Sequence, residues 1–340
     1  VIRIFIYSLA FISTLVGVEI LRRWSLSKNF LDVPNERSSH DTPTPTGGGL
    51  SIVIVSLSSL LVYQILYSEN IVWSYFVGAA LIAVISWLDD VVSLPVIWRF
   101  VCHFAAAFLV MFQLGYWEVV YIPIIGEINF GLFGIALTSL WIVWVINAYN
   151  FMDGIDGLAG LQAVVASLGW AFVGWYWQID LFLFFGMILF CTNLAFLVHN
   201  WHPAKIFMGD VGSAFLGFTF GVFPFLAFYE TKYSDFVTEF PLVSILLIWL
   251  FLFDTLFTFL RRLLKREKVW EAHRQHIYQI FIINGRSHSS VTLFYGWLSL
   301  TVVIGLISCF LVNKMELALI SLIVMITIFL VFAGRLKKVD

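Results

Sequence analysis

Charged residues are scarce in this chain of 340 residues. Only 12% of them are Asp, Glu, Lys or Arg, whereas 61% are hydrophobic and the mean hydropathy is +0.95. Soluble domains contain about 25% charged and about 45–50% apolar residues. The shortage of charge excludes an ordinary soluble domain, and we expect no nucleic-acid partner.

Cysteine is also rare. The three cysteines, Cys102, Cys191 and Cys309, lie in three separate apolar stretches. An odd number of isolated cysteines builds neither a disulfide framework nor a thiolate metal site, so we interpret them as small apolar side chains. The sequence also shows no internal repeat, no low-complexity tract and no soluble domain between its apolar runs.

Long apolar runs, by contrast, fill most of the chain. A helix needs about 20 apolar residues to cross the hydrocarbon layer of a bilayer, and eleven runs meet this requirement. They are residues 1–21, 47–67, 71–88, 95–114, 131–149, 157–176, 181–199, 213–229, 241–260, 290–312 and 317–334. We therefore expect an all-α polytopic membrane protein with about eleven transmembrane helices, forming one domain over residues 1–340.

The basic residues predict how these helices are oriented. With the N-terminus outside and the spans alternating, 16 of the 19 basic residues fall on inner segments, and Arg3, Lys232 and Lys314 fall outside. Because basic residues accumulate in cytoplasmic loops, the inner side is expected to be the cytoplasm, which also places the C-terminus there. Residues 118–130, with Gly126 near the middle, are expected to form a small extracytoplasmic hairpin.

Five polar clusters fall on inner ends of the spans in this topology. They are DVPNERSSHDTPTPTGGG (32–49), WLDD (87–90), NAYNFMDGIDGL (147–158), HPAKIFMGDVGS (202–213) and EAHRQHIYQ (271–279). Ionisable groups at membrane depth are expensive and usually functional. We therefore expect one site, built by loops on the inner side. These loops are at about 22–46, 89–94, 150–156, 200–212 and 261–289.

The NAYNFMDGIDGL segment carries oxygen ligands at a regular spacing. Asn147, Asn150, Asp153 and Asp156 follow one another at intervals of three residues, and a glycine comes directly after each of the two aspartates. Hard divalent cations prefer such ligands, so the spacing predicts a site for Mg²⁺ or for magnesium-bound phosphate. It is not an EF-hand, because the twelve-residue register and the closing Glu are missing. The alternative is a helix end capped by Asn, Asp and Gly.

Three further aspartates lie at predicted span ends. Asp89 and Asp90 are adjacent carboxylates, and such a pair needs a cation to keep both members ionised; the alternative is a solvated helix end. Asp210 lies between two glycines just before an apolar run. It is either a metal ligand or a helix N-cap.

Cationic side chains lie in the same inner segments. Arg99 begins the fourth span, Lys205 precedes Asp210, and His273, Arg274 and His276 share a strongly basic loop. A basic loop usually marks topology and attracts anionic lipid, but histidines beside an arginine can also bind a diphosphate. We interpret Arg99 as a phosphate contact.

These groups together suit one kind of chemistry. Carboxylates hold magnesium, magnesium neutralises a pyrophosphate, and Arg, Lys and His hold the remaining anionic oxygens. Phosphoryl transfer requires these parts, since its catalysis is mostly positioning and charge stabilisation. A site at the membrane implies a lipid substrate, so the residues predict magnesium-assisted phosphoryl transfer to or from a lipid.

At these motifs the chain resembles the polyprenyl-phosphate N-acetylhexosamine-1-phosphate transferases, glycosyltransferase family 4. NxxNxxDGxDGL and MGDxGS occur in the family's order and spacing, and the resemblance runs from the 32–49 loop to the HRQHIYQ loop. It implies a multi-pass enzyme of the bacterial inner membrane with a cytoplasmic active site. Such an enzyme transfers an N-acetylhexosamine-1-phosphate from a UDP-sugar to polyprenyl (undecaprenyl) phosphate, releases UMP and forms polyprenyl-diphosphate-sugar.

The resemblance also implies the partners and the pathway. The substrates would be the polyprenyl phosphate lipid and a UDP-N-acetyl sugar, and the cofactor would be Mg²⁺, with Mn²⁺ as a substitute. A homodimer is one candidate assembly, and the sequence leaves the oligomeric state open. The product would begin a cell-envelope glycan such as the O-antigen of lipopolysaccharide.

By position in the motifs, the resemblance assigns roles to single residues. Asp210 and Asn150 resemble the magnesium ligands. Asp156 resembles the group that reads uracil, and Asn147 and Asp153 support the same loop.

Asp89 and Asp90 are expected to place the lipid phosphate and the cation. A general base is worth little, because a phosphate with a second pKa of about 6 already carries most of its second charge at neutral pH. The 32–49 loop would frame the cleft, although many relatives carry a basic residue where this chain has Thr46, and Asp254 would line the cleft.

In the last loop, His276 with Arg274 and His273 resembles the family segment that binds the sugar and diphosphate. Many relatives have His-Ile-His where this chain has His276, Ile277 and Tyr278. The HRQHIYQ form is similar to the O-antigen-initiating branch that uses a 6-deoxy-N-acetylhexosamine. The donor therefore stays open between UDP-N-acetylglucosamine, UDP-N-acetylfucosamine and UDP-N-acetylquinovosamine.

Two other classes of membrane protein fit the sequence less well. A secondary transporter with an intramembrane cation site would carry polar groups near the bilayer midplane and an internal repeat, and neither is visible. A CDP-alcohol phosphotransferase would carry its DG…AR…G…D…D pattern within one stretch, which is absent.

Overall fold

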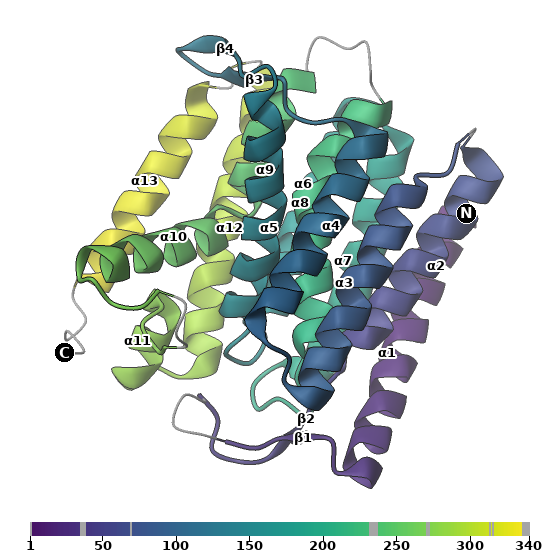
Figure 1. Ribbon diagram of the computed structural model, residues 1–340, viewed down its shortest axis with the longest axis vertical. Helices are drawn as coiled ribbons and strands as arrows, with labels where there is room; N and C mark the ends of the chain where they lie inside the picture. The colour runs from purple at the N-terminus through teal and green to yellow at the C-terminus, as the bar shows by residue number, and fades with distance from the viewer. Residues whose placement is uncertain are drawn as a thin grey trace.

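The computed structural model describes residues 2–34, 39–68, 70–230, 237–269, 273–312, 314 and 316–334. Long helices form a bundle with a short β-hairpin at each end (Figure 1). Within the described residues, nine helices are long and apolar enough to cross a membrane, or ten if the bent pair α9 and α10 counts as one span. The prediction of an all-α polytopic membrane protein is confirmed.

The helices follow the predicted spans closely. Their bounds are α1 (Ile2–Lys28), α2 (Gly49–Tyr67), α3 (Trp73–Val92), α4 (Val96–Leu114), α5 (Phe133–Met152), α6 (Leu158–Tyr176), α7 (Asp180–Asn200), α8 (Asp210–Glu230), α9 (Phe240–Leu247), α10 (Trp249–Leu264), α11 (Ile277–Ile283), α12 (His288–Val312) and α13 (Glu316–Ala333), with a 3₁₀ turn η1 at Val237–Glu239. The basic residue Lys232, residues 35–38 of the first loop and residues 270–272 of the last loop lie outside the described residues.

The ninth span differs from the straight helix expected over 241–260. Helices α9 and α10 meet at an angle of 79°, and α10 runs across the bundle instead of along it (Figure 1). On α10 the polar residues Asp254, Thr258 and Arg262 recur every fourth position and are buried. Residues at this spacing share one face of a helix, so α10 is amphipathic and turns its polar face toward the protein.

The centre of the bundle is formed by α6, α7 and α8. In the most apolar window of α6, 78% of the residues are buried, against 17% in α1 and in α13. Aromatic rings fill the interior, for example where Trp170 of α6 stacks on Phe223 of α8 at 4.8 Å between centroids. Helices α1 and α13 therefore lie at the periphery, with most of their apolar side chains turned outward.

The two hairpins mark the two ends of the bundle. The expected hairpin within 118–130 is confirmed: β3 (Val119–Ile122) pairs antiparallel with β4 (Gly126–Asn129). At the opposite end, β1 (Leu31–Asp32) pairs with β2 (Thr44–Pro45) (Figure 1). Helices α3, α5 and α7 end, and α4, α6, α8 and α12 begin, at this second end, which we call the polar end.

Candidate active site

Asp89 closes α3 and fixes the turn into α4. Its Oδ1 accepts a hydrogen bond from the Leu94 N–H at 2.7 Å, and its Oδ2 accepts one from Arg99 Nη1 at 2.7 Å. The turn itself passes through Ser93 in the left-handed region, with φ at 52°. The Asp89 carboxylate is thus paired, and it holds the Arg99 guanidinium at the polar end.

Asp90, the next residue, faces the start of α8. Its Oδ1 accepts a hydrogen bond from the Asp210 N–H at 3.3 Å, while its Oδ2 is buried and has no hydrogen-bond partner among the described residues. A Cβ on Gly209 would lie 3.1 Å from that Oδ2, and Gly209 has a φ of +75°. A buried carboxylate oxygen without a partner destabilises the folded protein. We therefore expect this oxygen to bind a cation or a proton.

Asp210 and Asn150 line one small cavity. The cavity holds about 10 Å³, and Arg99 and Asn147 also line it; this is room for roughly one water-sized particle. Arg99 Nη1 lies 3.4 Å from Asp210 Oδ2, and Asn150 Nδ2 donates to Ser213 Oγ at 3.2 Å. The two predicted magnesium ligands therefore meet at a space of the right size for one ion.

Asp153 adds a fourth carboxyl group. Burial raises its pKa well above the ordinary value for Asp, and the nearby negative charges of Asp210 and Asp90 raise that pKa further. Among the described residues, Arg99 is the cationic side chain within ion-pair distance of this group of acids. We call Asp89, Asp90, Asp153 and Asp210 the acidic cluster; its surplus of negative charge fits a divalent cation held by oxygen ligands.

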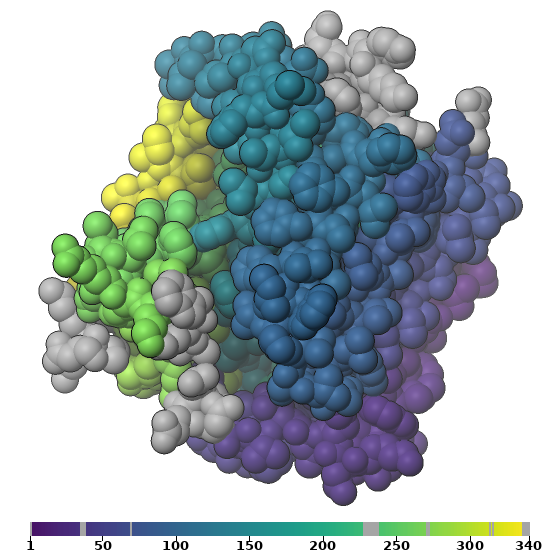
Figure 2. All heavy atoms as spheres, viewed as in Figure 1, coloured from purple at the N-terminus to yellow at the C-terminus, as the bar shows by residue number. Residues whose placement is uncertain are grey.

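The first loop closes over the acidic cluster, as expected for residues 32–49. The Phe207 N–H donates to the Pro45 carbonyl at 2.8 Å, and the Gly49 N–H donates to the Met208 carbonyl at 2.9 Å. A Cβ on Gly49 would lie 2.4 Å from the Cα of Gly212. The backbones of the PTPTGGG and MGDVGS segments therefore lie so close together that only glycine, which has no Cβ, fits at this contact. Figure 2 shows this N-terminal segment, in purple, across the lower end of the molecule.

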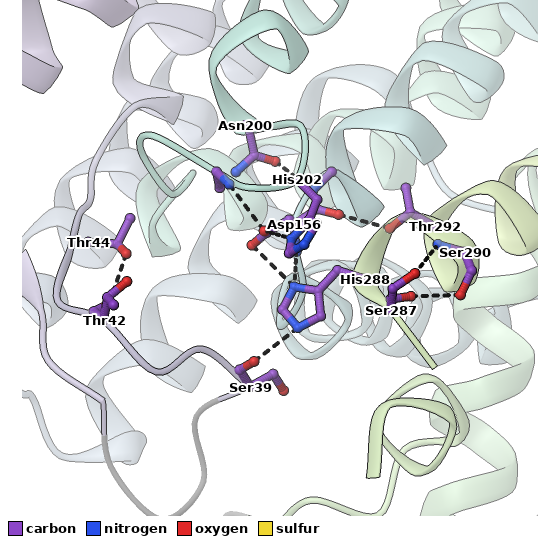
Figure 3. A network of polar contacts seen from close by, with 12 residues as sticks. Ser39, Thr42, Thr44, Asp156, Asn200, His202, Ser287, His288, Ser290 and Thr292 are labelled. Carbon is purple, nitrogen blue, oxygen red and sulfur yellow. Dashed lines mark hydrogen bonds and ion pairs between the residues drawn. The ribbon is translucent and has the colours of Figure 1, made fainter. Parts of the chain in front are cut away.

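Asp156 belongs to a second group of contacts (Figure 3). Its Oδ2 accepts hydrogen bonds from His202 Nδ1 at 2.6 Å and from the Ala204 N–H at 3.1 Å, and its Oδ1 lies 3.4 Å from His288 Nδ1. Burial alone would raise the pKa of Asp156, but the contacts with His288 and His202 outweigh it and leave the pKa below the ordinary value. We call Asp156, His202 and His288 the histidine cluster.

The two histidines of this cluster were not singled out from the sequence. His202 is the first residue of the HPAKIFMGDVGS cluster, in which the predicted site residues were Lys205 and Asp210. His288 lies outside all five polar clusters, at the start of α12. A histidine at the inner end of a predicted span is the one signal that the sequence offered for it.

Asp254 does not line the cleft, contrary to expectation. Its side chain is 0% exposed and accepts hydrogen bonds from His276 Nδ1 at 3.2 Å, from the Ile277 and Tyr278 N–H groups at 2.9 and 3.2 Å, and from the Tyr295 hydroxyl at 2.7 Å. A carboxylate with this many donors is satisfied within the protein. Asp254 therefore anchors the last loop to α10.

Tyr278 connects the last loop to the loop after α5. Its hydroxyl donates to the Phe151 carbonyl at 3.0 Å, and its ring packs where a Cβ on Gly154 would clash. The His276 ring stacks against Phe151 with 6.0 Å between centroids. The histidine loop and the DGIDG turn are thereby held side by side.

The remaining candidates lie around these groups. Burial and the positive charges nearby lower the pKa of His273 to about 4, so this ring is neutral at pH 7, and its centroid is 4.9 Å from that of His276. Arg274 is half-buried beside it, whereas Lys205 is exposed. Asn147 donates to the Val143 carbonyl of its own helix at 2.7 Å. The structure therefore brings all five predicted polar clusters to the polar end.

The comparisons with known proteins agree with this arrangement. Residues 72–227 match the model of glycosyl transferase family 4. The chain is 30% identical over 294 residues to a Bacillus subtilis (strain 168) protein named "Probable undecaprenyl-phosphate N-acetylglucosaminyl 1-phosphate transferase". The aligned region covers 86% of this chain and 80% of that protein.

Two other relatives carry different names for transferases. The chain is 29% identical to the decaprenyl-phosphate N-acetylglucosaminephosphotransferase of Mycobacterium leprae (strain TN), over 78% of this chain and 74% of the relative. It is also 29% identical to the phospho-N-acetylmuramoyl-pentapeptide-transferase of Listeria monocytogenes serotype 4b (strain CLIP80459), over 62% of this chain and 71% of the relative. The chain belongs to the polyprenyl-phosphate N-acetylhexosamine-1-phosphate transferase family, within glycosyl transferase family 4.

Proposed function

We propose that the protein transfers an N-acetylhexosamine-1-phosphate from a UDP-sugar to polyprenyl (undecaprenyl) phosphate at the cytoplasmic face of the bacterial inner membrane. One observation carries the proposal. Asp89, Asp90, Asp153 and Asp210 lie at one end of a membrane bundle, where Arg99 pairs with Asp89 and lies 3.4 Å from Asp210, and Asp90 Oδ2 has no hydrogen-bond partner among the described residues. The name of the Bacillus subtilis relative supports the lipid and the sugar phosphate, and the basic residues on the predicted inner segments support the cytoplasmic face.

The reaction exchanges one phosphoanhydride for another. An oxygen of the lipid phosphate bonds to the sugar-linked phosphorus of the UDP-sugar, and the bond from that phosphorus to the bridging oxygen breaks. UMP leaves with the electron pair. The lipid phosphate is mostly dianionic at neutral pH, since its second pKa is about 6, so no residue needs to remove a proton from it.

Asp210 and Asn150 would hold Mg²⁺, because they line the same small cavity. Asp90, whose Oδ1 accepts the Asp210 N–H, has a second carboxylate oxygen without a hydrogen-bond partner among the described residues. When bound, Mg²⁺ neutralises the diphosphate and stabilises the charge that develops on its oxygens; Mn²⁺ suits the same hard ligands. Arg99, held by Asp89, remains as a cation for phosphate oxygens.

The other two groups would bind the nucleotide and the sugar. Asp156, with its lowered pKa, presents a carboxylate that can accept a hydrogen bond from the uracil ring. His276, Arg274 and His273 hold the sugar and diphosphate, and Asp254 keeps their loop in place. The Tyr278 hydroxyl is already bound to the Phe151 carbonyl, so this residue shapes the sugar site without contacting the sugar through that group. We propose a 6-deoxy-N-acetylhexosamine donor and a role in starting O-antigen synthesis.

The test is UMP release by the purified protein in nanodiscs containing undecaprenyl phosphate. We expect release with Mg²⁺, none with EDTA, and none from Asp210→Ala. Asp180→Ala is the matched control, because Asp180 pairs with Arg3 at the far end of the bundle. Supplying UDP-N-acetylfucosamine, UDP-N-acetylquinovosamine and UDP-N-acetylglucosamine in parallel identifies the donor. Robust UMP formation by Asp210→Ala would remove Asp210 as a metal ligand, and no release with any donor would refute the activity.

A further inference from the structure

The histidine cluster is assembled from three separate segments. Asp156 lies between α5 and α6, His202 between α7 and α8, and His288 is the first residue of α12. One carboxylate oxygen and two imidazole nitrogens from these residues all lie within 4.8 Å of one another, and no other group of three or more His, Cys, Asp or Glu residues in the described part of the chain does so. Figure 3 shows the His202 and His288 rings beside the Asp156 carboxylate, with dashed lines joining each ring to Asp156.

The contacts of His288 define which of its nitrogens carries the proton. Its Nε2 lies 2.9 Å from the carbonyl oxygen of Ser39, which can only accept, so Nε2 is the donor. In the neutral ring, Nδ1 then presents a lone pair, and it accepts the Asp156 N–H at 3.4 Å. The same Nδ1 lies 3.4 Å from Asp156 Oδ1, so in the neutral ring two electron-rich atoms face each other, and either a proton on Nδ1 or a bound cation removes this repulsion.

A bound cation would resolve that opposition. Histidines that bind metals usually donate their second ring N–H to a backbone carbonyl or a carboxylate, which orients the ring, and His288 already does so with Ser39. The Asp156 carboxylate is likewise oriented by the Ala204 N–H at 3.1 Å. The backbone behind it is fixed too, because the Thr292 hydroxyl donates to the Asp156 carbonyl at 2.8 Å.

The spacing of the ligand atoms suits a tetrahedral ion. Zinc bonds to nitrogen and oxygen are about 2.0–2.1 Å long, which places neighbouring ligands of a tetrahedron about 3.3 Å apart. The His202 Nδ1 lies 2.6 Å from Asp156 Oδ2, and the His288 Nδ1 lies 3.4 Å from the other oxygen, Oδ1. One ligand atom from each of the three residues lies within 4.8 Å of the others, so an ion would draw them together by about an ångström. The His202 side chain is 40% exposed, so its ring has room to shift toward solvent when an ion binds.

We propose that Asp156, His202 and His288 bind one Zn²⁺ ion, at a site separate from the acidic cluster. Two imidazoles and one carboxylate favour zinc and its transition-metal neighbours over magnesium, whereas the acidic cluster offers oxygen ligands that favour magnesium. Three protein ligands leave a fourth position open. Bound zinc occupies the Asp156 carboxylate, and, resting on the function proposed above, this prevents Asp156 from binding uracil and inhibits the transfer.

Metal binding is tested without any substrate. The full chain, without an affinity tag, is first freed of bound metal with a chelator and then titrated with Co²⁺. The visible absorption bands of Co²⁺ report a four- or five-coordinate site. Zn²⁺ is then added to displace the Co²⁺. We expect one Co²⁺ ion per chain with the bands of a four- or five-coordinate site. Its affinity should fall at least about tenfold in His202→Asn and in His288→Asn, since even removal of an outer partner of a metal ligand costs that much.

His199→Asn is the matched control, because His199 also lies at the polar end but pairs with Glu19. It should bind Co²⁺ like the unmodified protein. If His288→Asn fails to fold, His202→Asn decides, since its exposed side chain carries little of the packing. Absence of stoichiometric binding, or unchanged affinity in His202→Asn, overturns the site and leaves the three residues as a hydrogen-bonded clamp.

The consequence for nucleotide binding is measured separately. At saturating Mg²⁺, Zn²⁺ should inhibit UMP release, and a higher concentration of the UDP-sugar should relieve the inhibition. Co²⁺ binding without such competition would refute the nucleotide part. A protein that binds Co²⁺ but releases no UMP under any condition would refute the proposed function while the metal site stands.

Discussion

Asp153 and Asp156 belong to one turn, three residues apart, yet their surroundings move their pKa values in opposite directions. Burial raises the pKa of Asp153, and the carboxylates of Asp210 and Asp90 raise it further. Burial also acts to raise the pKa of Asp156, but there the hydrogen bonds with His288 and His202 prevail and the pKa falls. Burial is shared, so the partners decide the direction.

The comparison extends to the clusters around the two residues. The acidic cluster has more carboxylates than cations and lacks a partner for Asp90 Oδ2 among the described residues. The histidine cluster surrounds one carboxylate with two imidazoles and a backbone N–H. One turn of the chain therefore serves two sites of different chemistry, the first suited to a hard cation and the second to a nucleobase or a softer metal.

Removing charge from the acidic cluster should have the largest effect on catalysis. Asp90→Asn keeps the side-chain volume but removes the charge of the unpaired oxygen, so the cation is held less tightly. We expect UMP release to fall by at least about 100-fold and the Mg²⁺ concentration needed for half-maximal rate to rise. Asp180→Asn, at the other end of the bundle, should leave both unchanged. An Asp90→Asn variant with an unchanged Mg²⁺ requirement would separate Asp90 from the metal.

The histidine cluster should respond in KM more than in kcat. Asp156→Asn removes the charge that accepts a hydrogen bond from the nucleobase, and a hydrogen bond to a charged group is worth about 1.5–3 kcal/mol. We expect KM for the UDP-sugar to rise about 10- to 100-fold while kcat falls much less. Steady-state kinetics on Asp90→Asn and Asp156→Asn distinguish the two clusters, and equal loss of kcat in both would erase the distinction.

A third carboxylate, Asp254, contrasts with both clusters because all its oxygens are satisfied internally. Asp254→Ala leaves the His276 ring, two backbone N–H groups and the Tyr295 hydroxyl without their acceptor. We expect a loss of at least about 3 kcal/mol of stability, visible as a lower melting temperature. Tyr295→Phe, which removes one of the donors to this carboxylate, should cost less, about 1.5–3 kcal/mol. If Asp254→Ala melts like Asp180→Ala, the anchor assignment is wrong.

The sequence predicted the helices well and the bend at α9 and α10 not at all. Long apolar runs are a direct signal for spans, and the polar clusters at their ends correctly indicated where the chain returns to one side. Hydropathy averages over all faces of a helix, however, so the buried polar face of α10, with Asp254 and Arg262, was hidden within an apolar run. Asp254 was expected to line the cleft because it lies near the inner end of the ninth predicted span.

The acidic cluster was easier to find from the sequence than the histidine cluster. Asp89, Asp90, Asp153 and Asp210 lie in motifs whose glycines and spacing draw attention. His288 is a single histidine far from those motifs, and its partner Asp156 lies 132 residues away along the chain. Only the packing of α12 beside α6 brings these residues together, which no local pattern records.

The smallest effect should be on stability against pH, and it tests the opposite pKa shifts directly. A group with a raised pKa in the folded state stabilises the protein below the ordinary Asp pKa of about 3.9 and loses this contribution as the pH rises through the raised value. Asp153 is of this kind. Asp156 is the reverse, since its contribution is present above the ordinary pKa and is lost as the pH falls through the lowered value.

Melting temperatures between pH 5 and pH 8, measured in EDTA so that no cation competes with protons, should therefore fall as the pH rises. Asp153→Asn has no carboxyl proton to lose, so its melting temperature should fall less over this pH range. The difference should be about 2–5 °C for each unit by which folding raises the pKa of Asp153. Asp156→Asn should leave the slope in that range as it is, because its own titration lies below it. Parallel melting curves for Asp153→Asn and the unmodified protein would mean that Asp153 is ionised throughout. The two aspartates of the turn would then differ in their neighbours but not in their charge.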